Sequence, residues 1–203
     1  MKKTELNEEQ VSNGASESFQ GQIPYNVRVN LQGASDFLFH RWNNESIAAK
    51  AASKKGSADK KTDNIESYVY RLDNGNLAIP GLYVSAAMRF SAKFKQDPRS
   101  PRKSAMDLYR AGVIPLTKLS DLGKKDWDYE DRQRVTIQRS GITRCRPAMK
   151  EGWVAEFEFL VTTPEYIQKK DFLEVLSQAG RLIGIGDFRP SYGRFNVINF
   201  EVF

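Results

Sequence analysis

The C-terminal quarter of the chain switches its hydrophobic periodicity twice, and this switch constrains the fold more than any other feature. Residues 153–161 alternate apolar and polar side chains, as expected of a strand with one buried face. Residues 171–183 repeat their apolar side chains with the helical period, and residues 195–203 return to an alternating pattern. Such a strand–helix–strand unit buries its apolar surface only if the helix packs on a sheet.

The N-terminal half predicts the matching elements. Residues 25–31 alternate as a strand, and Asn74-Gly75 separates two short apolar runs as the turn of a hairpin. Residues 82–94 then read as a helix. We therefore expect an α+β fold with a ferredoxin-like (RRM-like) βαββαβ core and both helices on one sheet face. An extra hairpin and a basic insertion at 96–150 would decorate the domain at 23–203, after a disordered N-terminal tail at 1–22.

Composition narrows the chemistry that the chain can perform. The 203 residues contain one cysteine, Cys145, and one histidine, His40, which excludes an internal disulfide, a cysteine-rich zinc site and most catalytic triads. We expect no cofactor and no metal. No apolar run approaches the ~20 residues of a membrane span. The prediction is a cytoplasmic protein without a membrane partner.

Positive charge is concentrated in one segment. The whole chain carries a net charge of +6, whereas residues 89–150 hold 16 basic against 7 acidic residues. Concentrated positive charge indicates a polyanionic partner, because neutralising phosphates releases condensed counterions. A solvated basic face without a ligand is the alternative interpretation.

Two motifs lie where the predicted elements meet. Ile79-Pro80-Gly81 joins a strand to a helix that carries Arg89, and residues 181–195 place a glycine-rich loop between the second helix and the last strand. Together they resemble the RAMP superfamily of CRISPR-associated proteins, over about residues 23–203. The resemblance implies a backbone subunit of an effector complex. A stand-alone relative from a mobile element is the other form that it allows.

The glycine-rich loop is the first candidate nucleic-acid site. Glycines allow positive φ and let backbone N–H groups approach a phosphate, while arginines on either side bind phosphate and aromatic rings stack on bases. The alternative is a tight turn whose aromatic rings, Phe188 and Tyr192, pack on the sheet. The candidate binding residues of this loop are Gly184, Gly186, Arg189, Tyr192, Gly193 and Arg194.

Two further basic stretches would extend that surface. Residues 132–147 alternate basic or polar with apolar side chains and predict a β-ribbon that turns near Ser140-Gly141, similar to the thumb of RAMP backbone subunits. A solvated hairpin is the alternative. The remaining candidate contacts are the helix stripe Ser85, Arg89 and Lys93, the ribbon arginines Arg132, Arg134, Arg139, Arg144 and Arg146, and Arg28 and Arg41 near the first strand.

The leading hypothesis is a protein that binds single-stranded RNA, or DNA, without sequence preference. Copies of the chain would assemble head to tail along the strand, with other CRISPR-type effector subunits as further partners. The enzyme alternative is a metal-independent endoribonuclease that processes guide RNA, with His40 as the catalytic candidate and Arg41 stabilising the transition state. A third reading is a mobile-element assembly or regulatory protein that uses the fold to bind another protein.

Overall fold

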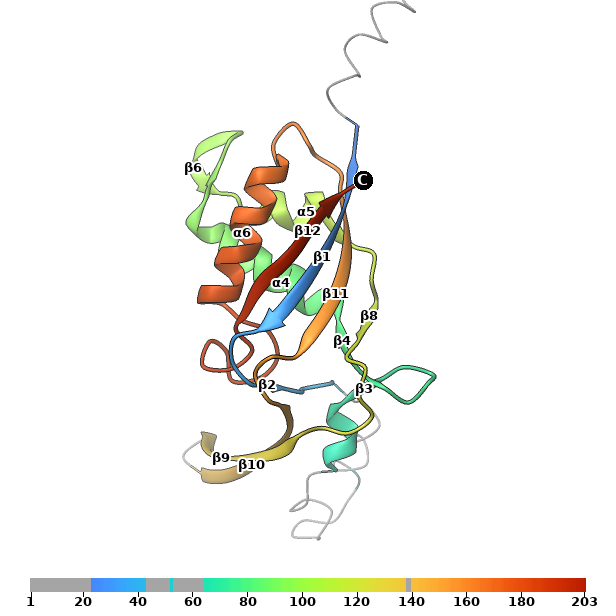
Figure 1. Cartoon of the computed structure of the whole chain (residues 1–203). Helices are drawn as coiled ribbons and strands as arrows, with labels where there is room; N and C mark the ends of the chain where they lie inside the picture. The colour runs from blue at the N-terminus through green and yellow to red at the C-terminus, as the bar shows by residue number, and fades with distance from the viewer. Residues whose placement is uncertain (1–22, 43–51, 53–63, 138–139) are drawn as a thin grey trace, which may run out of the picture.

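The computed structural model describes residues 23–42, 52, 64–137 and 140–203. The expected N-terminal tail at 1–22 lies outside these residues. The fold is α+β, and its central sheet has four antiparallel strands (Figure 1). Their spatial order is β12 (Phe195–Val202), β1 (Tyr25–Gly33), β11 (Val154–Val161) and β7 (Val113–Pro115).

Alternation along these strands separates a buried face from an open one. Val27, Val29 and Leu31 of β1 are fully buried and lie in register with Phe159, Phe157 and Ala155 of β11. The residues between them, such as Arg28, face the other side. This is the two-residue period that the sequence displays.

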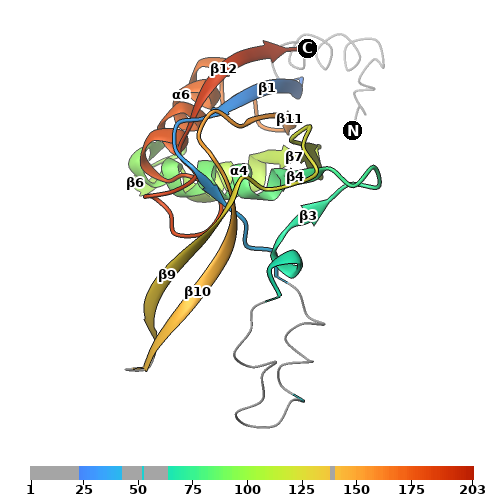
Figure 2. The same cartoon turned by 60° about the horizontal axis from the view of Figure 1, so that its bottom comes forward.

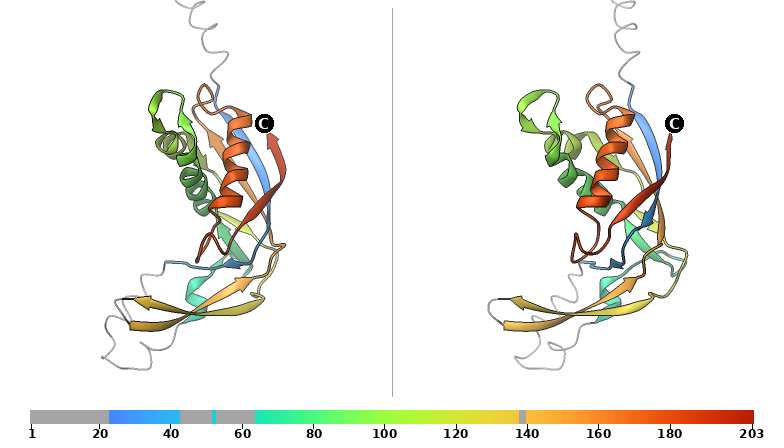
Figure 3. Two further views of the ribbon diagram at one scale, coloured as in Figure 1. Left: turned by 90° about the vertical axis from the view of Figure 1, so that its left-hand side faces the viewer. Right: turned by 60° about the vertical axis from the view of Figure 1, so that its left-hand side comes forward.

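The helices of the described residues cover the buried face of the sheet, as the side views show (Figure 3). Helix α6 (Lys169–Leu182) packs on β12 and on α4 (Gly81–Ser91), and Ser91 Oγ lies 3.2 Å from Gln178 Oε1 across the helix pair. Phe172, Val175, Leu176 and Ala179 supply the buried stripe of α6. The two helices expected from the periodicity are therefore confirmed, on the expected side of the sheet.

Short elements surround this core. The hairpin predicted around Asn74-Gly75 forms, and it joins a third strand in a small sheet. The remaining elements are η1 (Ile65–Tyr68), β3 (Tyr70–Arg71), β4 (Leu77–Pro80), β8 (Leu119–Asp121), η2 (Ala92–Phe94), β5 (Gln96–Asp97), β6 (Ser100–Ser104), α5 (Met106–Gly112) and β2 (Phe37–Leu38).

The segment 96–150 is more than the single insertion that the sequence indicates. Strand β7 pairs with β11 and is the outer strand of the central sheet, while α5 contacts α4. The part that projects is the hairpin of β9 (Tyr129–Ile137) and β10 (Ser140–Met149), which extends well away from the globular body (Figure 2). Its base pairs with β2 through Ala148 and Met149.

Candidate nucleic-acid interface

The antiparallel register of β9 and β10 divides the hairpin arginines between two faces. Arg134 lies opposite Thr143, and Arg132 lies opposite Cys145. Both arginines are exposed, and Arg132 has a 3.2 Å ion pair with Glu130. The opposite face carries Arg144 beside Gln133 and Arg146 beside Asp131. Arg139 lies outside the described residues.

The base of the hairpin is bonded to the loop that follows α6, which lies between α6 and the hairpin (Figures 1 and 3). The Gln133 side-chain amide donates to the Tyr192 hydroxyl at 2.9 Å, and that hydroxyl lies 3.3 Å from Asp131 Oδ1. The pKa of Tyr192 is raised, mainly by burial and next by the nearby Asp131 carboxylate. Tyr192 therefore joins the loop to the hairpin through its hydroxyl.

Arg146 belongs to the same set of contacts between the hairpin and the α6 loop, called the joint below. It is only 2% exposed, its Nε donates to Asp187 Oδ2 at 2.8 Å, and its guanidinium lies 4.0 Å from the centre of the Tyr68 ring. The assignment of Arg146 as a phosphate contact is therefore corrected: a buried, carboxylate-paired guanidinium holds the hairpin to the loop. Asp187 was not singled out in the sequence, where it is one acidic residue in a glycine-rich stretch.

The glycines of the loop are required by its backbone conformation and close packing. Gly184, Gly186 and Gly193 all have positive φ. A Cβ on Gly193 would lie 1.7 Å from the Ile185 carbonyl oxygen, so only glycine fits. The N–H groups of Ile185, Asp187 and Gly193 donate to the carbonyls of Gly193, Leu38 and Asp36. The expected phosphate cradle is therefore wrong for these three N–H groups, which already have carbonyl partners.

Arg28 is also removed from the cationic surface. It lies on the open face of the sheet, where its guanidinium bonds Glu158 at 2.7 Å and approaches Glu156 and Glu201 at 3.9 Å each. Its ring contact is with Phe203, 5.1 Å from the ring centre. Three carboxylates surround one guanidinium, so this face does not attract a polyanion.

The basic stripe of α4 meets the α6 loop around one phenyl ring. Arg89 Cζ, Lys93 Nζ and Arg189 Cζ lie 4.9, 5.2 and 6.0 Å from the centre of the Phe90 ring. Arg189 and Lys93 are exposed. The first member of the stripe, Ser85, donates its hydroxyl to Leu82 of its own helix.

A second group of rings lies at the start of α4. Tyr70 and Tyr83 meet edge to face at 6.0 Å, and Arg41 Cζ lies 5.6 Å from the centre of the Tyr70 ring. Trp42, next to Arg41, is 71% exposed. Cations interleaved with rings in this way are typical of surfaces that bind single strands. Sequence reasoning missed these rings and Phe90 and Phe94. The run Arg89-Phe90-Ser91-Ala92-Lys93-Phe94 was the available signal.

His40 lies between these groups. Its ring stacks on Tyr68 at 6.0 Å, its Nδ1 lies 3.6 Å from Asp187 Oδ2, and its carbonyl accepts a hydrogen bond from the Tyr83 hydroxyl. Burial lowers the pKa of His40, and Arg146 and Arg144 lower it further against the opposing effect of Asp187. Burial would raise the pKa of Asp187, but the hydrogen bond from Arg146 and the nearby His40 bring it below the ordinary value. The imidazole is therefore favoured in its neutral form.

Arg194 completes the list of loop candidates. It is exposed, and its Nε donates to the Pro190 carbonyl at 2.8 Å. Arg189 and Arg194 thus keep the exposure that a phosphate contact needs, whereas the glycines and Tyr192 of the same loop are engaged within the protein.

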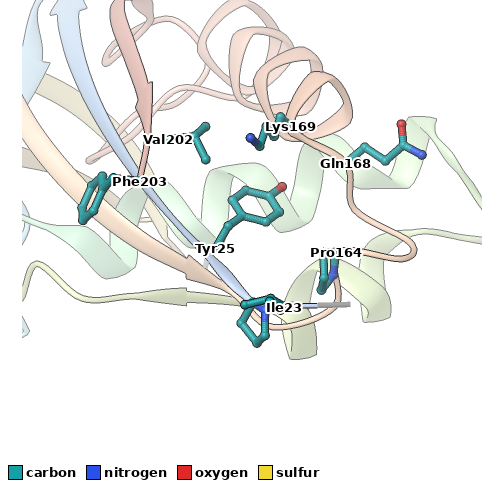
Figure 4. A pocket seen from close by; sticks show the side chains of 8 residues that line it. Ile23, Tyr25, Pro164, Gln168, Lys169, Val202 and Phe203 are labelled. Atoms are coloured by element: carbon teal, nitrogen blue, oxygen red, sulfur yellow. The ribbon is translucent and has the colours of Figure 1, made fainter. Parts of the chain in front are cut away.

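One cavity lies away from these cationic groups. A cavity of about 540 Å³ opens beside Ile23 and Phe203 at the other end of the sheet (Figure 4). Lys169 is the cation in its lining, among mostly apolar side chains. In the described part of the chain, no helix is long and apolar enough to cross a membrane. Within those same residues, no group of three or more His, Cys, Asp or Glu could hold a metal ion.

Comparison with known proteins gives a likeness of fold. No family model matches the chain, and no curated protein matches it. Among solved structures, a chain of the Type III-B Cmr-beta bound to cognate target RNA, determined by cryo-electron microscopy, is similar with a TM-score of 0.52. The likeness covers 97% of this chain and 68% of that chain at 12% sequence identity. At this identity the likeness concerns the fold alone.

Proposed function

We propose that the chain is a RAMP-type subunit with a ferredoxin-like core that binds single-stranded RNA, as in CRISPR-type effector complexes. Support for the core comes from the strand order β12-β1-β11-β7, in which the fourth, first, third and second strands of a βαββαβ unit lie side by side. Support for the ligand comes from the similar chain, which is part of a complex bound to target RNA.

The observation that carries the proposal is a group of exposed or partly exposed cations without carboxylate partners within the described ranges. Arg89, Lys93 and Arg189 have no ion pair among the described residues, and they gather around a ring beside the loop that joins the hairpin. Arg134 and Arg132 are exposed and extend the positive charge along the hairpin, with Arg132 also paired to Glu130. Uncompensated cations beside aromatic rings bind a phosphodiester chain without regard to sequence.

The test is the binding of a labelled single-stranded RNA to an Arg132→Ala/Arg134→Ala variant. Both side chains are exposed, so the variant keeps the fold. Removing two phosphate contacts should weaken binding and reduce the magnitude of the salt slope by about 1.4, at ~0.7 for each phosphate on a single strand. Unequal binding of matched RNA and DNA would then give the preference for the sugar.

The matched control is Arg102→Ala/Arg110→Ala. This variant removes two equally exposed arginines from β6 and α5, at the end of the molecule away from the hairpin (Figure 1). The control should retain the affinity and slope of the parent protein. Equal losses of RNA affinity in both variants would mean that net charge alone, and not the hairpin, determines binding. Undiminished binding by the hairpin variant would contradict the proposal.

We also propose that copies of the chain assemble head to tail along the strand, together with other effector subunits. The hairpin projects beyond the body of its own protomer, which favours contact with a neighbour (Figure 2). Contacts between different surfaces of identical copies extend into a filament unless the rotation closes a ring. Sedimentation with RNA of increasing length should show complexes that grow in steps of one protomer.

A metal-independent endoribonuclease is the second candidate, favoured by the environment of His40. Its imidazole is 39% exposed and stacks on Tyr68, and its Nδ1, which has no hydrogen-bond partner among the described residues, lies 3.6 Å from Asp187 Oδ2. A neutral imidazole placed in this way could take the proton from a 2′-hydroxyl, with Arg41 near the reacting phosphate. Cleavage of structured RNA in EDTA that disappears in His40→Ala would establish this activity, and intact RNA with the parent protein would exclude it.

A further inference from the structure

A pocket of about 360 Å³ lies between the C-terminal end of α4 and the loop that follows α6. This volume is near the lower end of the ~300–1,000 Å³ found for small-molecule sites. The pocket thus has room for one nucleotide-sized group. Its lining consists of Phe90, Lys93, Phe94, Leu182, Ile183, Arg189 and Pro190.

One side of this pocket is cationic. Lys93 and Arg189 line it, and Arg89 lies over the same Phe90 ring. In the part of the chain that the structure describes, no carboxylate forms an ion pair with any of the three cations. The Nε of Arg89 is buried and has no hydrogen-bond partner there either. Cations gathered around one ring, with an unpaired N–H donor among them, would be stabilised by a bound anion.

The other side of the pocket is apolar and open. Phe94 is 66% exposed and Leu182 is 49% exposed, with Ile183 and Pro190 between the two helices' ends. Large apolar side chains left in solvent beside a cavity indicate a ligand that covers them. A flat ring stacked on Phe94 would do so.

We propose that this pocket binds a single nucleotide, with the base against Phe94 and Leu182 and the phosphate between Lys93 and Arg189. The inference rests on the proposed function, because the nucleotide would be one unit of the bound strand, turned away from its neighbours. The hairpin then holds the backbone, and the pocket holds one base at the other side of the α6 loop.

The test compares two strands of the same length, one with bases and one in which every base is replaced by an abasic linker. The variant Phe94→Ala should bind the base-bearing strand at least about fivefold more weakly, the lower end of what one stacked base contributes. It should bind the abasic strand as the parent protein does. Lys93→Ala/Arg189→Ala should weaken both strands, because both retain the phosphates.

The control for loss of an exposed ring is Phe203→Ala, at the other end of the sheet and 59% exposed. It should change neither affinity. Equal affinity of Phe94→Ala and the parent protein for the base-bearing strand would overturn the proposal and leave the pocket to an acidic protein partner. An equal loss with both strands would overturn it as well, because no base would then be involved.

A parent protein that binds no strand would contradict the proposed function and not yet the pocket. In that case saturation-transfer NMR with AMP tests the pocket directly. Transfer to the adenine protons that disappears in Phe94→Ala supports a nucleotide site. Absence of transfer in the parent protein overturns it.

Discussion

Replacing Asp187 by alanine should destabilise the protein strongly, because it leaves the guanidinium of Arg146 buried without a counter-charge. Arg146 is 2% exposed and donates to Asp187 Oδ2 at 2.8 Å, and its Nη1 donates to the Cys145 carbonyl at 2.9 Å. Removing one partner of a buried ion pair costs about 3–5 kcal/mol. At a urea dependence of about 2 kcal/mol/M, the midpoint of unfolding should fall by roughly 1.5–2.5 M.

The double variant Arg146→Met/Asp187→Ala separates the ion pair from the packing. Methionine keeps the unbranched stem beside Tyr68, and no buried charge remains. The double variant should therefore be more stable than Asp187→Ala alone, with a coupling between the two sites of at least ~1 kcal/mol. Urea unfolding followed by tryptophan fluorescence measures all four proteins of this cycle: the parent, Asp187→Ala, Arg146→Met and the double variant. Additive losses would refute the reasoning, because they would mean that the two side chains do not depend on each other.

Two further perturbations address the same joint. Gly193→Ala should lower the stability of the protein by more than the ~1–2 kcal/mol that a left-handed alanine costs, or unfold the loop, because its Cβ would meet the Ile185 carbonyl. Gly123→Ala is the control, because Gly123 also has positive φ but has open space around it, so this variant should lose only the backbone strain. A thermal melt of each variant measures the loss. Burial holds the folded pKa of His40 below its ordinary 6.5, so the unfolded chain binds the proton first and stability is lost as the pH falls through and below that value. Urea titrations at a series of pH values should show a smaller loss for His40→Gln, and an unchanged profile would contradict this assignment.

The periodic elements could be predicted from the sequence because their information is local. Strands β1, β11 and β12 and helix α6 each carry a buried stripe that the alternation or the helical repeat reveals. The turn at Asn74-Gly75 was equally accessible, because Gly75 takes a positive φ, which favours glycine.

Strand β7 could not be found in the same way. It has three residues, one of them Pro115, and its place at the edge of the central sheet depends on pairing with Phe159, Leu160 and Val161 of β11. Three residues give too short a window for a periodicity, and the intervening chain is rich in charge and proline. The segment 96–150 therefore reads as a single insertion although part of it completes the core.

The candidate site shows what a list of arginines leaves undecided. Arg28 and Arg146 each occupy a strand position that alternates correctly, as Arg132 does. Their partners, Glu158 and Asp187, are 130 and 41 residues away along the chain. Only the tertiary register brings those carboxylates to the guanidinium groups, so no local pattern separates a structural arginine from one left for a ligand.

The distribution of counter-charges also indicates on which side of the molecule the strand binds. On the open face of the sheet, Glu156, Glu158 and Glu201 surround a single arginine and repel a phosphodiester chain. Around Phe90 three cations have no carboxylate partner among the described residues. A polyanion that approaches the protein is therefore steered past the sheet to the α4 and hairpin side. If this reasoning is right, Glu158→Gln should leave the affinity for RNA nearly unchanged at high salt and raise the association rate at low salt, whereas a lower rate in stopped-flow measurements would place the strand on the open face of the sheet instead.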